Sequence, residues 1–362
     1  SGPRASPLSP PLSLASLVAD GVRLGRAGDT RAAEARLDAA VTHWPDSAAG
    51  WREISGLRFR QERWREAAAA AERAVRCDPA DSAAWSLLGA SRFLDERPEA
   101  ALAAWNAVGT PRLDQSRIEG LRRTRYPIVA RRLGLRPGQL LTPGDFRRAR
   151  RRLEAIPAIG SSRFGLRPLS GGLAEVDAAV VERPLLPGSP LEAGALAARA
   201  IVRREAVLTV AGPTGGGELW RASWRWEDRR PRWGLEVRAP GLFGLGGVFE
   251  AEGFREVQTY DAERAGGILP ETRAGGAVSP GDAAARPAPA AIGSGAREIR
   301  EARRGARIGW SDWVVADLRL AAQVAFERWE VPRGRFAAAG LGVSMRRDGG
   351  PPHHQADRVA IR

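Results

Sequence analysis

The 362-residue chain contains no lysine and only one cysteine, Cys77. The missing lysine excludes a P-loop, a Schiff-base enzyme and a protein kinase, because each of these sites needs a lysine. A single cysteine excludes an intrachain disulfide framework and a cysteine-rich zinc site. The chain also lacks a run of about twenty uncharged apolar residues. That absence excludes a transmembrane helix but not strands that cross a membrane.

Residues with catalytic chemistry are also scarce. The three histidines are His43 and the adjacent pair His353 and His354, which lies in a Gly- and Pro-rich tail. No Gly-x-Ser-x-Gly elbow occurs, and no Gly-x-Gly-x-x-Gly follows a strand and opens a helix. We therefore predict no catalytic, cofactor-binding or metal-binding residues, no small-molecule substrate and no enzymatic activity.

The formal net charge of +14 comes entirely from arginine. These arginines are scattered among acidic residues, and the chain is also rich in Ala, Gly and Pro, as expected from a GC-rich genome. We therefore predict no nucleic-acid partner; steeply salt-dependent DNA binding would support that alternative. Residues 1–12 are Pro- and Ser-rich, lack the apolar core of a signal peptide and are expected to be flexible. Because the chain begins with Ser, we expect a processed or truncated piece.

The first third of the chain repeats itself. Trp51 and Trp85 lie 34 residues apart, as do Pro45 and Pro79. The same frame places small residues where two helices cross closely, namely at Gly21, Ser55 and Gly89, at Ala33, Ala67 and Ala101, and at Ala40 and Ala74. With this period, residues 13–111 resemble tetratricopeptide repeats and predict an all-α solenoid.

Tetratricopeptide stacks bind extended peptides in a concave groove. The resemblance therefore implies a partner-binding groove, with Arg52, Phe59 and Phe93 as its candidate residues. The alternative for Phe59 and Phe93 is packing between helices. Cys77 and His43 are each single residues on a helix, without a second ligand in view.

Residues 112–184 predict a small α/β module. The expected elements follow the order strand, helix, helix, strand, strand, at residues 114–121, 127–133, 144–156, 161–168 and 174–181. Thr142 is a good N-cap for the second helix, with Pro143 at its first position. The last two strands are joined by the turn at 170–172.

This order, the phrase Gly134-Leu135-Arg136-Pro137-Gly138, the Leu-Thr-Pro cap and the ending Val181-Glu182-Arg183-Pro184 resemble a POTRA domain. The resemblance implies a periplasmic βααββ domain that offers a strand edge to client proteins and precedes an outer-membrane barrel. An exposed edge has unpaired backbone groups that an extended client can satisfy. The arginines on the second helix form either a solvated face or a contact with an acidic partner; they are Arg147, Arg148, Arg150, Arg151 and Arg152.

After a linker at 185–197, residues 198–362 alternate with the period of strands. Candidate strands lie at 200–210, 218–227, 232–239, 248–260, 318–326 and 337–345, and a period-free Ala/Gly/Pro segment at 263–295 is expected to be disordered. One apolar face contains Trp220, Trp224, Trp226, Trp233, Leu235 and Val237. Such a face meets a second sheet in a soluble sandwich, or lipid in a membrane barrel. The POTRA resemblance favours lipid contact.

The C-terminal part resembles barrels of the bacterial surface antigen superfamily, and this resemblance implies about sixteen strands. The sequence contains only about eight candidate strands. We therefore predict a truncated barrel, with a complete eight-stranded barrel as the lesser alternative. Counted from a periplasmic start, the 263–295 insert falls on the periplasmic side, where turns should be short.

Together these features predict a multidomain protein of the bacterial outer membrane, with a tetratricopeptide–POTRA arm in the periplasm and an antiparallel transmembrane β-barrel. By resemblance, it assists the assembly, insertion or translocation of other proteins. Its expected partners are outer-membrane lipid and unfolded or extended clients, which bind the repeat groove and the POTRA strand edge. The alternative is a periplasmic protein-binding scaffold that the barrel merely anchors and that is not itself an insertase.

Overall fold

A computed structural model describes residues 13–186, 189–242, 245–261, 298–331 and 334–347. The chain forms two compact units. The first comprises Ser1–Gln115, Arg136–Phe146 and Leu166–Val176, and the second comprises Ser116–Leu135, Arg147–Gly165 and Asp177–Arg362. Among the described residues, none of the helices has both the length and the apolar composition needed to cross a membrane.

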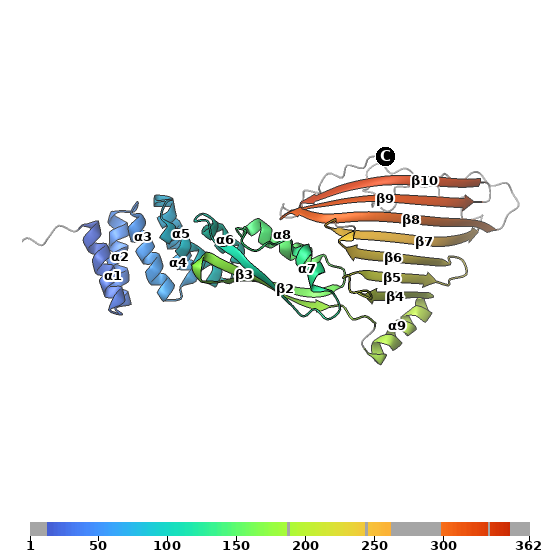
Figure 1. The fold of residues 1–362 in the computed structure, drawn as a ribbon, viewed down its shortest axis with the longest axis horizontal. Coiled ribbons are helices and arrows are strands. Elements are labelled where there is room, and N and C mark those ends of the chain that lie inside the picture. The colour runs from blue at the N-terminus through green and yellow to red at the C-terminus, as the bar shows by residue number, and fades with distance from the viewer. Residues whose placement is uncertain (1–12, 187–188, 243–244, 262–297, 332–333, 348–362) are drawn as a thin grey trace, which may run out of the picture. The chain divides into compact units, whose positions relative to one another are not determined.

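The chain begins with six helices in antiparallel pairs (Figure 1). They are α1 (Leu14–Arg26), α2 (Thr30–His43), α3 (Ala48–Arg60), α4 (Trp64–Cys77), α5 (Ser82–Leu94) and α6 (Pro98–Asn106). The helices of successive pairs begin 34 residues apart, so the predicted period is the structural repeat. The indole nitrogen of Trp51 donates to the Pro45 carbonyl at 2.7 Å, and Trp85 repeats this bond to Pro79 at 2.9 Å.

Small residues permit the close packing of these helices. Ala33, Ala67 and Ala101 are completely buried. A Cβ added at Gly89 would lie 2.3 Å from Nε1 of Trp105, and the Ser55 hydroxyl donates to the Ala67 carbonyl at 2.8 Å. The predicted helical repeat is thus confirmed.

The next segment forms a three-stranded sheet with two helices, here called the α/β module (residues 112–182). Its elements are β1 (Arg112–Glu119), α7 (Tyr126–Leu133), α8 (Pro143–Glu154), β2 (Ile159–Pro168) and β3 (Leu173–Glu182), and the sheet order is β1-β3-β2. The element order is the predicted one, with bounds within two residues. Thr142 Oγ1 accepts a hydrogen bond from the backbone N–H of Asp145 at 3.1 Å, as predicted for the N-cap of α8.

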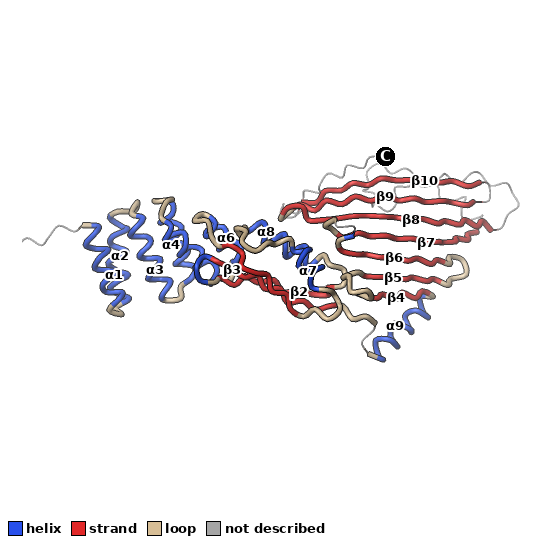
Figure 2. The backbone as a smooth tube through the Cα atoms, in the orientation of Figure 1, coloured by secondary structure: helices blue, strands red, loops and turns tan. Residues whose placement is uncertain are grey.

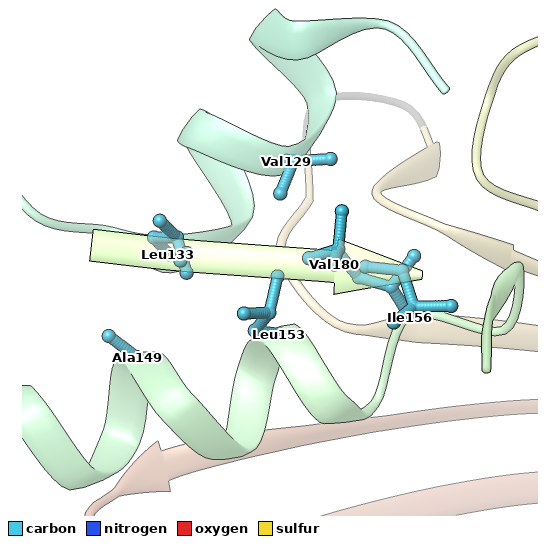
Figure 3. Packing of buried hydrophobic residues seen from close by; sticks show 8 residues of the cluster. Val129, Leu133, Ala149, Leu153, Ile156 and Val180 are labelled. Atoms are coloured by element: carbon cyan, nitrogen blue, oxygen red, sulfur yellow. The ribbon is translucent and has the colours of Figure 1, made fainter. Parts of the chain in front are cut away.

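Apolar residues from both helices and the sheet form the core of the module. Val129 and Leu133 of α7 pack with Leu153 of α8, with Ile156 just beyond α8 and with Val180 of β3 (Figure 3). Each of these side chains is at most 4% exposed. Burial on this scale stabilises the module by about 1.5–3 kcal/mol per large side chain before chain entropy is counted.

The C-terminal part is one antiparallel sheet of seven strands in the order β10-β9-β8-β7-β6-β5-β4 (Figures 1 and 2). The strands are β4 (Glu205–Ala211), β5 (Leu219–Arg225), β6 (Arg232–Pro240), β7 (Val248–Asp261), β8 (Glu298–Val315), β9 (Leu318–Val331) and β10 (Gly334–Arg347). The described strands form an open sheet with β4 and β10 at its edges. The predicted antiparallel strands are confirmed, whereas the predicted closure into a barrel is not present among them.

One end of this sheet contacts the α/β module and is called the near end. The turns at 212–218 and 316–317 lie there, together with the described residues 241–242 and 245–247. The backbone N–H of Arg125 donates to Gly215 at 3.0 Å, and that of Ala158 donates to Gly217 at 3.1 Å. The opposite, far end has the turn at 226–231, the last residues of β7 and the first residues of β8.

The segment predicted as a linker and the start of a strand is instead a helix, α9 (Pro190–Arg203). Ser189 caps it by accepting from the N–H of Glu192, Pro190 occupies the first turn, and Glu192 complements the helix dipole. Since the 212–218 turn that follows β4 lies at the near end, the chain enters β4 at the far end.

β7 ends and β8 begins at the far end, away from the module from which the predicted strands were counted. The insert predicted at 263–295 lies outside the described residues, and its side of a membrane stays a prediction. The strand predicted at 218–227 is also shorter, since β5 ends at Arg225 and Trp226 lies beyond it.

Candidate functional site

The register of the sheet gives it two chemically distinct faces. Directly paired residues share a face, so one transverse row can be followed across all seven strands. It contains Val210, Trp220, Val237, Ala251, Ile308, Val324 and Leu341. The next row toward the far end contains Leu208, Ala222, Leu235, Gly253, Ala306, Phe326 and Ala339. This surface, called the apolar face, has no charged residue in either row.

The apolar face is uncovered. Ile308 is 66% exposed, Val324 54% and Leu341 52%. Contiguous exposed apolar surface of this extent marks an interaction with a membrane or another protein. A second packed sheet is absent among the described residues, so the sandwich alternative has no support there.

Five of the six predicted lipid-facing residues share the apolar face: Trp220, Trp224, Trp233, Leu235 and Val237. Of these, Val237 is half-buried, and the other four are exposed. The sixth, Trp226, is half-buried beyond the end of β5 and lies 5.3 Å from the Trp224 ring. Their contact with lipid stays a prediction.

The opposite, polar face is crossed by ion pairs. Arg303 contacts Glu327 at 2.6 Å, and the exposures of their side chains are 27% and 10%. Glu252 lies 3.6 Å from both Arg232 and Arg307. Further pairs on this face join Arg221 to Glu236, Arg225 to Glu205 and Glu256, and Arg238 to Glu236 and Glu250. Alternation of an apolar face with an ion-paired face is typical of a wall between lipid and a wet interior.

The candidate groove residues of the repeats are all half-buried. Arg52 donates to Asp81 at 2.8 Å. The Phe59 ring lies 5.0 Å from Trp64 in an edge-on arrangement, and the Phe93 ring lies 6.0 Å from Trp105. Both phenylalanines therefore pack against a neighbouring helix or its start, as the alternative interpretation predicted, and peptide binding by them stays a prediction.

The arginines of α8 contact the near end of the sheet, which resolves the choice that the sequence left open. Arg151 stacks on Trp313 with its guanidinium carbon 4.4 Å from the ring centroid. Arg147 and Arg151 each lie 3.6 Å from Asp317 in the β8–β9 turn. The acidic partner is thus supplied by the same chain.

Asp312 is the centre of this contact. Its carboxylate lies 2.8 Å from Arg132 of α7 and accepts a hydrogen bond from Arg152 of α8 at 2.6 Å. The side chains of Asp312 and Arg132 are only 7% and 4% exposed. Burial lowers the pKa of Arg132, and the Asp312 charge opposes that shift. We call Arg132, Arg152 and Asp312 the buried clamp; no pattern in the sequence indicates Asp312.

A cavity of about 550 Å³ adjoins the clamp. Arg131, Arg132, Arg152 and Glu218 contribute its charged groups, and Trp220 and Leu245 are among its apolar lining residues. No group of His, Cys, Asp or Glu within the described ranges is arranged to bind a metal ion.

Two glutamates with buried side chains order loops by accepting backbone hydrogen bonds, and one of them, Glu218, lines this cavity. Glu182 accepts from the backbone N–H groups of Arg123 and Thr124 at 3.0 and 2.8 Å, and Glu218 accepts from that of Thr214 at 2.6 Å. Burial alone would raise both pKa values, but the hydrogen bonds together outweigh it and lower the pKa of each carboxyl.

These shifts predict a pH dependence. A folded-state pKa below the unfolded value of about 4.3 means that the stabilisation is complete above that pH and is lost as the pH falls through the folded-state pKa. We expect the free energy of unfolding to decrease as the pH is lowered from 6 to about 3. The combined variant Glu182→Gln, Glu218→Gln should be less stable at pH 6 and show a shallower decrease in urea titrations. An unchanged slope would contradict the assignment.

Cys77 and the histidines, which the sequence analysis also considered, do not belong to the buried clamp or the cavity. Cys77 is exposed, and His43 is exposed beside Trp44 at a ring distance of 5.7 Å. His353 and His354 lie outside the described residues, as does the predicted flexible segment 1–12.

Comparison with known proteins identifies the first part of the chain. The family model of the tetratricopeptide repeat matches residues 19–81 and 57–112. No curated protein sequence matches the chain.

Among solved structures, the first tetratricopeptide domain of Spaghetti (RPAP3), bound to an HSP90 peptide, is 20% identical. The match has a TM-score of 0.26 and covers 26% of this chain and 75% of that one. The Sgt2 repeat domain from Aspergillus fumigatus is 24% identical, with a TM-score of 0.26, 29% coverage of this chain and 69% of that chain. BamA from Haemophilus ducreyi lacking POTRA domains 1–3 is 12% identical, with a TM-score of 0.36; the match covers 65% of this chain and 43% of that chain.

Proposed function

We propose that this chain is an outer-membrane protein whose seven-stranded sheet forms a wall of a transmembrane β-barrel, and whose repeats and POTRA-like module form a periplasmic arm. The observation that carries the proposal is the two-faced sheet: an exposed apolar face across seven strands, backed by an ion-paired polar face. From Leu320 to Arg328 the outward residues of β9 span about 26 Å of strand at 3.3 Å per residue. A tilt near 40° reduces this to about 20 Å of depth, close to the apolar band of about 25 Å in such barrels.

The arm gives the protein its proposed role in assisting the assembly, insertion or translocation of other proteins. Tetratricopeptide repeats support protein binding. The module has β1 and β2 at the edges of its sheet, where an extended client could add a strand. The buried clamp joins α7 and α8 of this module to the end of β8.

Membrane insertion is tested by paired substitutions on β9. Val324 lies at the middle of the apolar face, and the adjacent Gln323 lies on the polar face. Val324→Arg should weaken incorporation into phosphatidylcholine vesicles by about 2–4 kcal/mol, whereas Gln323→Arg should be tolerated. The measurement is the fraction of protein that floats with vesicles and resists protease. Equal incorporation of the two variants would refute a lipid-facing sheet.

Assistance to clients is tested separately, in vesicles that contain the wild-type chain. An unfolded barrel protein should insert faster into these vesicles than into empty ones. Equal rates, with the chain itself properly inserted, would overturn the insertase role and leave the anchored protein-binding scaffold.

A further inference from the structure

Near the far end, one transverse row of the apolar face contains charged residues. Counted across the strands, this row contains Ala206, Trp224, Trp233, Arg255, Arg304, Arg328 and Ala337. Three arginines therefore stand side by side on β7, β8 and β9, immediately beyond a row that has no charge. We call Arg255, Arg304 and Arg328 the arginine row.

The arginine row is accessible and poorly neutralised. Arg255 and Arg304 are exposed and Arg328 is half-buried. Arg304 donates to Glu330 at 2.9 Å, but within the described ranges Arg255 and Arg328 have no ion-pair partner. Glu330 also faces Arg335 directly across the strand pair. The polar face differs, because there the arginines are matched by glutamates, as in Arg303 with Glu327.

The position of the row is also distinctive. Trp224 and Trp233 are a directly opposed pair in the same row, and they are 61% and 54% exposed. Tryptophan prefers the boundary between hydrocarbon and headgroups, and arginine extends its guanidinium to the same level while its methylene stem stays in the apolar layer. The row therefore marks the boundary of the proposed membrane band at the far end of the sheet, away from the α/β module.

From this arrangement we propose that the arginine row binds the anionic phosphate headgroups of lipids in the leaflet farther from the α/β module. This inference rests on the proposed membrane location. Guanidinium groups form two parallel hydrogen bonds to phosphate oxygens, and the three arginines extend from adjacent strands whose backbones lie about 4.8 Å apart. A headgroup phosphate at this level would neutralise the positive charges of Arg255 and Arg328, which have no ion-pair partner among the described residues.

The test compares incorporation of the full chain into vesicles of phosphatidylcholine alone and into vesicles that also contain phosphatidylglycerol. The wild type should prefer the anionic vesicles. Since each arginine near an anionic surface contributes about a fivefold preference, the triple variant R255Q, R304Q and R328Q should lose at least about tenfold of it. Its incorporation into neutral vesicles should be unchanged, which also shows that it folds.

A matched control removes the same charge elsewhere. Arg31, Arg36 and Arg76 are exposed on the helices of the repeats, and the variant R31Q, R36Q and R76Q should keep the full preference. Loss of preference in this control, or its retention in the arginine-row variant, would overturn the proposal. Abolition of the preference by inorganic phosphate at constant ionic strength would also overturn it, because the row would then bind free phosphate. Failure of the wild type to enter either vesicle would instead contradict the proposed membrane function.

Discussion

Replacing Asp312 with alanine is expected to lower the free energy of unfolding by about 3–5 kcal/mol, because it leaves Arg132 charged, buried and without its partner. The Arg132 side chain is only 4% exposed and lies 2.8 Å from the carboxylate. Although burial lowers its pKa, a guanidinium does not lose its proton in a protein at neutral pH. The charge therefore remains, and the structure must open to hydrate it.

The effect should appear first at the near end of the sheet. Arg152 also loses its hydrogen bond to Asp312, although its bond to the Trp313 carbonyl at 3.1 Å persists. We expect the β8–β9 turn to exchange amide protons faster and to become sensitive to protease. Chemical denaturation of the detergent-solubilised protein measures the loss of stability, and hydrogen exchange locates it.

Asp317 provides the matched control for this experiment. Its side chain is 40% exposed, and it lies 3.6 Å from Arg147 and Arg151. Because exposed ion pairs contribute about 0–1 kcal/mol, Asp317→Ala should cost less than 1 kcal/mol. Similar losses for the two variants would show that burial of the clamp is not what matters. Replacing Arg132 and Asp312 together by leucine should restore part of the stability that Asp312→Ala loses.

The clamp illustrates what the sequence could not reveal. Arg152 and Asp312 are 160 residues apart, and neither the arginine run on α8 nor a single aspartate near the end of a strand indicates the other. Their meeting depends on the packing of α8 against a strand end, which local patterns do not encode. The arginine row was missed for a related reason, since Arg255, Arg304 and Arg328 become neighbours only through the strand register.

Patterns with a repeated or alternating signal were predicted well. The 34-residue period located the helices because each repeat buries the same small residues, such as Ala33, Ala67 and Ala101. The two faces of β5 and β6 followed from side-chain alternation. Segment 190–203 was mispredicted as a linker and the start of a strand. The cap at Ser189, the proline at 190 and Glu192 were the overlooked helix signals.

Gly120→Ala is the second substitution with a large expected effect, about 3 kcal/mol or more. Gly120 follows β1 with a φ of +86°, and an added Cβ would lie 2.0 Å from the carbonyl oxygen of Val180 on β3. The cost has two parts, a left-handed backbone conformation that disfavours alanine and a clash with backbone atoms that cannot rotate away. Relief requires β1 and β3 to separate, which would expose Val180 and loosen the core of the module.

Gly138 separates these two parts of the cost. Its φ is +80°, but no heavy atom lies within 4 Å of the Cβ position. Gly138→Ala should therefore lose only the conformational part, about 1–2 kcal/mol, while Gly120→Ala loses this and the clash together. Urea denaturation of both variants measures the difference, and amide exchange at Val180 reports whether β1 and β3 separate. If the two alanine variants were equally stable, Gly120 would not approach Val180 closely in solution, and the end of β1 would pack differently against β3.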